Sequence, residues 1–147
     1  MSLKEKLLED LKNALRNKDS IRKNTVQMAR AAVLQVEKDN KTTLDDDGVV
    51  EVLSRELKKR RDSLLEYEKS GRQDLVDNLK KEIDILLEYL PKQMTEEELE
   101  ILIKEAISST GAQSVRDVGK VMKEVMPKVK GRADGKVVNR IAVKLLE

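Results

Sequence analysis

The residues of this sequence whose types and spacing suggest a chemical role are lysines and arginines near its C-terminus. Between residues 120 and 144 there are eight lysines and arginines against two carboxylates, a local charge of +6 in a chain of net charge +2. A region of one sign attracts anionic partners. Two sets of three cations fall at helical spacing: Arg116, Lys120 and Lys123, then Lys136, Arg140 and Lys144.

These two sets predict basic stripes on two consecutive helices, with Asn139 beside the second stripe. The connecting turn adds three further cations, Lys128, Lys130 and Arg132. If the stripes share one side of the helical pair, they form a basic surface roughly 20–25 Å long, from a rise of about 1.5 Å per residue. Such a surface could bind the phosphates of a nucleic acid, or it could simply be a solvated face.

The positions of the aromatic residues indicate whether a single-stranded or a folded nucleic acid would bind. Proteins that bind single strands stack bases on aromatic side chains. Here the only aromatic residues are Tyr67 and Tyr89, and both lie outside the basic region. Recognition would therefore rest on phosphates and shape, which favours a folded RNA over a single strand.

Two glycines near the last helix have two interpretations. Gly131 and Gly135 flank Arg132-Ala-Asp134, so backbone amides at the start of that helix could approach a phosphate closely. Asp134 is also the expected N-cap, however, and its carboxylate would occupy the same amides. The alternative is that both glycines only shape a tight turn.

No catalytic, metal or cofactor site is predicted. The chain has no histidine and no cysteine, so the commonest general base and the thiol nucleophile are both missing. Asp45-Asp-Asp-Gly48 resembles part of a calcium loop. The spacing, however, puts Thr43 and Ser54 where such a loop needs its first Asp and its bidentate Glu.

Helices must position the basic residues. Charged residues make up 39% of the chain, the apolar residues are almost all aliphatic, and there are only two prolines, so the expected fold is all-α. Met28, Leu65 and Val115 are among the apolar residues expected to face inward. Apolar spacing predicts seven helices, at about 2–17, 21–36, 47–69, 75–90, 95–109, 115–126 and 135–146.

Two parts are expected, an N-terminal four-helix domain at 1–91 and a smaller C-terminal three-helix domain at 92–147. Gly71 should join two long helices of the first domain into an antiparallel hairpin. The run Lys58-Lys59-Arg60-Arg61 points in several directions around its helix and predicts a solvated, salt-bridged face. No apolar run is long enough to span a membrane, no secretory signal pattern is present, and cysteine is absent, so we expect a cytoplasmic protein.

Five motifs are spread along the chain: Lys59-Arg60-Arg61-Asp-Ser-Leu, Glu68-Lys-Ser-Gly-Arg72, Glu88-Tyr-Leu-Pro-Lys-Gln93, Gly119-Lys-Val-Met122 and Gly131-Arg-Ala-Asp-Gly-Lys-Val-Val-Asn139. With these motifs the chain resembles the YqeY family over essentially its whole length, and its second half also resembles the tail of the B subunit of the tRNA-dependent amidotransferase. The resemblance implies a connection to tRNA, because the amidotransferase tail contacts tRNA and a similar module is attached to some glutaminyl-tRNA synthetases. It implies as candidates for RNA contact Lys120, Lys123, Lys128, Lys130, Arg132, Lys136, Asn139 and Arg140.

The leading hypothesis is a non-catalytic helical module that binds tRNA, another folded RNA or a tRNA-handling enzyme through its C-terminal basic face. A second hypothesis is a protein-interaction accessory of the amidotransferase or of an aminoacyl-tRNA synthetase, contacting its partner through the 47–90 hairpin. A third is participation in amidotransferase activity, a carbon–nitrogen ligation with glutamine as amido donor. The catalytic cradle of the amidotransferase B subunit is absent, so the resemblance implies no amido transfer by this chain alone.

Overall fold

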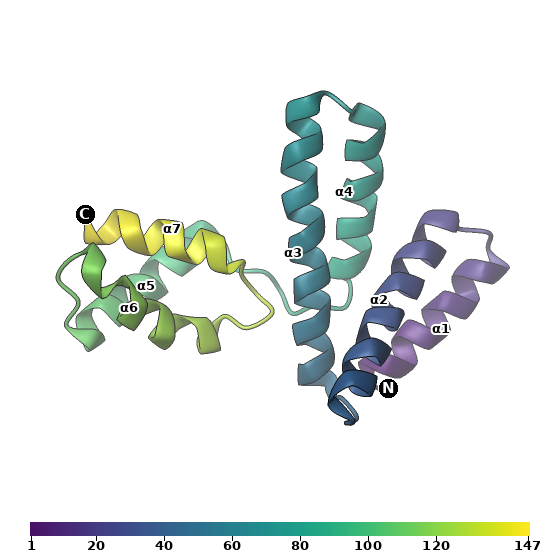
Figure 1. The fold of residues 1–147 in the computed structure, drawn as a ribbon, viewed down its shortest axis with the longest axis horizontal. Helices are drawn as coiled ribbons and strands as arrows, with labels where there is room; N and C mark the ends of the chain where they lie inside the picture. Colours follow the sequence, from purple (N-terminus) through teal and green to yellow (C-terminus); the bar gives the residue numbers. More distant parts are fainter. The chain divides into compact units, whose positions relative to one another are not determined.

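A computed structural model describes residues 1–147 and contains helices without any strand, which confirms the all-α prediction. The chain divides into two compact units, Met1–Leu90 and Pro91–Glu147 (Figure 1). Each unit has an aliphatic core of its own. None of the helices is long and apolar enough to cross a membrane.

The N-terminal unit is built from two helical hairpins (Figure 1). α3 and α4 form the expected long hairpin, in which Gly71 adopts a left-handed φ of 74° between the two helices. α2 contacts both of them and α1, so it links the hairpins. The helices are α1 (Leu3–Arg16), α2 (Ser20–Asn40), α3 (Asp46–Ser70) and α4 (Gln73–Leu87). Each contributes fully buried side chains to the core, for example Leu7, Val26, Leu53 and Leu86.

The C-terminal unit is a bundle of three helices, α5 (Glu96–Thr110), α6 (Val118–Val125) and α7 (Gly135–Leu146), with 3-10 turns at Val115–Asp117 and Met126–Lys128. Each helix contacts the other two. α6 ends at Val125, as expected near Met126, because Pro127 disfavours helical geometry in the residue before it. The core of the C-terminal unit includes Ile103, Val121, Val125, Val138 and Ala142.

Side-chain caps explain where most of the helices begin. In each case a side-chain oxygen accepts a hydrogen bond from a backbone N–H of the first turn, which otherwise lacks a partner. At α5 the cap is a full capping box, because Thr95 and Glu98 bond to each other's backbone amides. The capping residues are Ser2, Asp19, Asp45, Thr95 and Asp134.

Some apolar residues that we expected inside are exposed, among them Leu15, Met28, Leu65 and Val115. Leu65 keeps 59% of its surface because it follows Leu64, and successive helical residues point about 100° apart. Leu64 takes the position against the core, so Leu65 must turn away from it. α4 also ends at Leu87, earlier than expected, and the turn that follows places Tyr89 in the core.

A buried ion cluster ties α3 to α4. Arg60 is only 7% exposed, and its Nε lies 3.3 Å from Glu82 Oε1 on α4. Its Nη1 donates to the carbonyl oxygen of Glu56 at 3.1 Å and to Glu56 Oε1 at 3.4 Å. The prediction of a solvated cationic run is therefore wrong for Arg60, because a carboxylate on the neighbouring helix holds this guanidinium inside the unit.

Candidate functional site

The segment before α6 differs from the prediction, and this affects the first basic stripe. Ser114 makes no side-chain cap, and residues Val115–Asp117 form a 3-10 turn. Asp117 Oδ2 instead accepts the backbone N–H of Gln113 at 2.9 Å, and this bond holds the pKa of Asp117 below its ordinary value. Arg116 therefore lies on a turn, outside the helix that carries Lys120 and Lys123.

The cations of α6 lie on its exposed side, opposite the buried Val121 and Val125. Lys120 Nζ is 3.8 Å from Asp117 Oδ1, a long contact in which the lysine is exposed and the aspartate is half-buried. Lys123 is exposed one turn further along the helix. A long contact to an exposed lysine contributes little stability.

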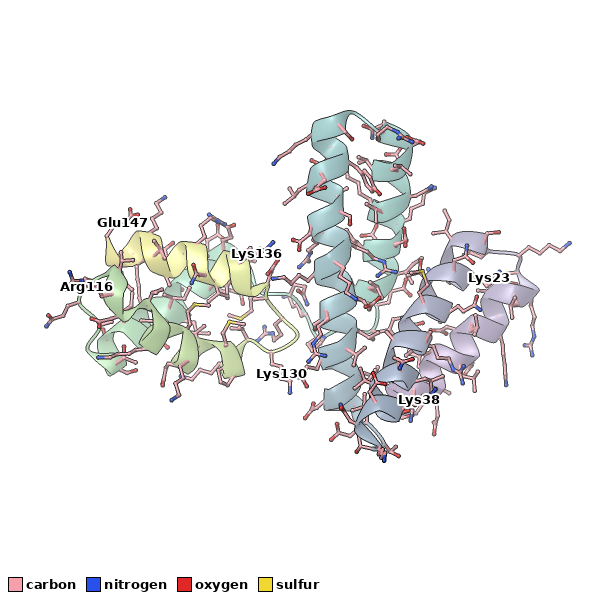
Figure 2. All side chains as sticks on the ribbon, in the orientation of Figure 1. Lys23, Lys38, Arg116, Lys130, Lys136 and Glu147 are labelled. Carbon is pink, nitrogen blue, oxygen red and sulfur yellow. The ribbon has the colours of Figure 1, made fainter.

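The connecting loop carries two exposed lysines, Lys128 and Lys130, and Lys136 is exposed in the first turn of α7. Lys128 Nζ lies 3.5 Å from Glu124 Oε1, one turn earlier in the chain. Figure 2 shows Lys130 and Lys136 at this loop end, whereas Arg116 lies at the opposite end, near Glu147. The long axis of the unit therefore separates Arg116 from the loop lysines.

The basic residues of α7 do not all face the same way. Arg140 Nη2 lies 2.6 Å from Glu96 Oε1 in the first turn of α5. Arg140 and Lys144 line a groove between α5 and α7, with Glu96 and Glu100 on the other side. This side of α7 thus borders the helix richest in carboxylates, and the two predicted stripes do not join into one uninterrupted basic face.

Arg132 is held by the chain segment that precedes α5. Its Nε donates to the carbonyl oxygen of Lys92 at 2.9 Å, and its own carbonyl oxygen accepts the backbone N–H of Met94 at 2.9 Å. The side-chain amide of Gln93 donates to the carbonyl oxygen of Gly131 at 2.8 Å. Arg132 is consequently half-buried, unlike the lysines on either side of it.

The geometry at the start of α7 favours the structural interpretation of the glycines. Gly131 has a left-handed φ of 75°, which a tight turn requires of it. Asp134 Oδ1 accepts the backbone N–H of Lys136 at 2.9 Å and so occupies the helix N-terminus. A Cβ added to Gly135 would meet only an ordinary contact with Met126, and its backbone is helical. Asn139 is exposed on the same helix.

Sequence reasoning missed a polar cluster in the other unit. The hydroxyl of the buried Tyr89 donates to Asp10, and Lys6 Nζ lies 4.7 Å from the centre of its ring. Burial, together with the carboxylate of Asp10, raises the pKa of Tyr89 far above its ordinary value. These contacts fix the last turn of the N-terminal unit onto α1. Only the occurrence of a tyrosine among aliphatic residues could have indicated them.

Comparison with known proteins gives matches along most of the chain. A family model described as Yqey-like protein matches residues 4–146. Altered inheritance of mitochondria protein 41, mitochondrial, of Pyrenophora tritici-repentis is 31% identical over 130 residues, which is 87% of this chain and 71% of that protein. Proteins of the same name from Kluyveromyces lactis and Lachancea thermotolerans are 36% and 33% identical, over 56% and 65% of this chain. The aligned regions are 45% and 51% of those two proteins, about half their length.

These relatives contradict the expected cytoplasmic location, because all three are named as mitochondrial proteins. The expectation depended on the absence of cysteine, of a membrane span and of a secretory signal. None of these features distinguishes the cytosol from the interior of a mitochondrion, since the composition of a folded helical unit does not encode its destination.

Proposed function

This chain belongs to the YqeY family, and on that premise we propose that its C-terminal unit binds tRNA or another folded RNA. The observation that carries the proposal is the separation of charge inside that unit. α5 holds five carboxylates and one lysine, whereas residues 116–144 hold nine cations and three carboxylates. The lysines proposed to contact phosphate are Lys120, Lys123, Lys128, Lys130 and Lys136.

This set is smaller than the ten residues suggested by spacing alone. Arg132 uses its Nε to hold the Lys92 carbonyl, so it contributes to the shape of the loop. Arg140 is paired with Glu96, and the neighbouring carboxylates of α5 would repel a phosphate placed in that groove. The five lysines stand on α6, in the loop and at the first turn of α7, and all are exposed.

The type of ligand follows from what these lysines can recognise. The C-terminal unit has no aromatic residue, so it offers no platform on which a base could stack. Lysine ammonium groups engage phosphates as point charges and carry little sequence information. The resemblance of this half of the chain to the tail of the amidotransferase B subunit supports tRNA as the folded RNA.

A titration of the protein with mixed tRNA at several salt concentrations tests the proposal. If five phosphates are engaged, the logarithm of affinity should fall with the logarithm of salt concentration at a slope of about −3.5 to −4.5. Absence of binding at low salt, or a slope near zero, would remove tRNA and other folded RNA as ligands of this surface.

Charge-neutralising variants then locate the surface. Lys120→Gln with Lys123→Gln should weaken binding for every tRNA species and make the slope less steep by about 1.4 to 1.8. Lys12→Gln with Lys80→Gln is the matched control, because it removes two exposed cations from the N-terminal unit. An equal loss of affinity in both double variants would assign binding to net charge and contradict a defined surface.

The alternative of a protein contact on the 47–90 hairpin has weaker support from the geometry. This alternative depended on the run Lys59-Arg60-Arg61. Arg60 is buried between Glu56 and Glu82, so it is not available to a protein partner. Affinity purification before and after nuclease treatment separates the two ideas. Protein partners that survive nuclease and are lost in a hairpin variant would favour the protein contact over RNA binding.

A further inference from the structure

We propose that Gln93 and Arg132 are positioning residues for the basic surface, an inference that rests on the proposed RNA binding. They fasten the loop between α6 and α7 to residues 91–94, and thereby fix the backbone that carries Lys128 and Lys130. We call this set of contacts between residues 91–94 and 131–132 the loop clasp. Its function is to present the loop lysines to phosphate in one arrangement.

The loop clasp consists of three hydrogen bonds across about forty residues of sequence. Two come from side chains: Gln93 Nε2 to the carbonyl oxygen of Gly131 at 2.8 Å, and Arg132 Nε to that of Lys92 at 2.9 Å. The third joins two backbones, from the Met94 N–H to the Arg132 carbonyl oxygen at 2.9 Å. Gln93 Nε2 also lies 3.1 Å from the carbonyl oxygen of Pro91, which orients the amide.

These bonds add a tie to residues 91–94 in a loop whose other support is local, from the Arg132 N–H to the Val129 carbonyl oxygen at 2.8 Å and from Ala133 packed against the core. The 3-10 turn ends at Lys128, and the side chain of the next residue, Val129, is fully buried. Val129 is therefore the first anchor of the loop. The clasp supplies the second anchor at Gly131, so Lys130 is held on both sides. Fixing the backbone before binding lowers the conformational entropy that ordering would otherwise cost, and so raises affinity.

The clasp joins two separate sequence motifs of this chain. Glu88-Tyr-Leu-Pro-Lys-Gln93 supplies the side-chain amide and a carbonyl acceptor, and Gly131-Arg-Ala-Asp134 supplies the guanidinium and the left-handed turn. Each motif donates one side-chain hydrogen bond to a backbone carbonyl oxygen of the other motif. Neither motif needs to touch RNA for its side chains to matter in RNA binding.

Gln93→Ala is the sharpest test, because it changes no charge. Loss of one hydrogen bond should shift the loop away from its clasped arrangement by a factor of about 2 to 12, and tRNA affinity should fall by up to that factor. The salt slope should stay the same, because no phosphate contact is removed. Gln73→Ala is the matched control, since Gln73 also donates through its side-chain amide, to Asp77 at 2.8 Å, but lies in the N-terminal unit. Equal affinity of Gln93→Ala and Gln73→Ala would overturn the positioning role.

Arg132→Gln tests the other side chain. A positioning residue should lower affinity without changing the salt slope, whereas a direct phosphate contact should make the slope less steep by about 0.7 to 0.9. The second outcome would make Arg132 part of the binding surface and overturn its role as a positioning residue. Lys123→Gln, which removes one cation of the surface, provides the slope change for comparison.

Hydrogen exchange tests the clasp without RNA. The amide of Met94 and the loop amides at 129–132 should exchange faster in Gln93→Ala than in the wild type, while the amides of α5 and α7 stay protected. Unchanged exchange in the loop would overturn the clasp even if tRNA binds. Faster exchange in a protein that does not bind tRNA would leave the clasp in place and refute RNA binding instead.

Discussion

Replacement of Arg60 by methionine should destabilise the N-terminal unit strongly, because this arginine is the centre of a buried ion cluster. The guanidinium lies between Glu56 on its own helix and Glu82 on α4. Methionine fills a similar volume, so the substitution removes the charge and the donors without leaving a large cavity. What remains is a carboxylate at Glu56 that is only 9% exposed.

The expected loss follows from that carboxylate. Breaking a buried ion pair by removing one partner costs about 3–5 kcal/mol, mostly through the charge left behind. Two features place the cost at the lower end of that range: Lys59 Nζ still lies 3.2 Å from Glu56 Oε2, and the side chain of Glu82 is 25% exposed and can be hydrated. We therefore expect Arg60→Met to lower the free energy of unfolding of this unit by about 3 kcal/mol.

Native-state hydrogen exchange of the most protected amides of α2, α3 and α4 measures this free energy for the N-terminal unit alone. Lys59→Met is the control, because it removes the neighbouring cation, whose side chain is 74% exposed, and should cost less than about 1 kcal/mol. Adding Glu56→Leu to Arg60→Met removes the stranded carboxylate and should recover most of the loss. If Arg60→Met costs no more than Lys59→Met, the cluster does not act as a buried ion pair.

Two further predictions concern the same unit. Glu37 Oε2 accepts hydrogen bonds from Lys4 Nζ at 2.6 Å and from the backbone N–H of Leu44 at 2.8 Å, and these hold the pKa of Glu37 below its ordinary value. Because the folded pKa is depressed, this stabilisation is present above the unfolded pKa and is lost as pH falls through the folded pKa. Carboxyl titration by NMR should show a higher pKa for Glu37 in Lys4→Met, and an unchanged pKa would contradict the assignment. Gly71→Ala should lower the free energy of unfolding by about 1 kcal/mol in urea, because a Cβ strains a backbone with φ of 74°. No atom lies within 4 Å of that Cβ, so a steric clash adds nothing. A cost near zero would show that the turn rearranges.

The features that the sequence predicts well are those that depend on neighbours in the chain. Thr95 with Glu98, Asp134 before α7 and Gly71 after α3 each act within one helical turn, so their residue types specify the helix ends directly. The end of α6 near Met126 was predictable for the same reason, because Pro127 constrains the backbone of the residue before it.

The features that it predicts poorly depend on contacts between distant segments. The burial of Arg60 requires Glu82, a residue on another helix, so a run of four cations gives no sign of it. Arg132 resembled a phosphate contact because its charge was visible, while its hydrogen-bond acceptor, the Lys92 carbonyl, lies forty residues earlier. The pairing of Arg140 with Glu96 likewise depends on how α7 meets α5. Spacing therefore identified the cations of the candidate surface but not the directions in which they point.

The position of the two tyrosines determines which part of the molecule can be followed by near-ultraviolet spectroscopy. Tyr89 is buried and Tyr67 half-buried, both in the N-terminal unit, and the sequence contains no tryptophan or phenylalanine. Near-ultraviolet absorption and intrinsic emission therefore monitor only that unit, whereas far-ultraviolet dichroism monitors the helices of both. Heating one unmodified sample under both kinds of detection would thus show whether the two units melt together. The C-terminal unit has no aromatic residue, so its own near-ultraviolet absorption and emission cannot report RNA binding, and a fluorescence assay of that unit needs labelled RNA or an added label.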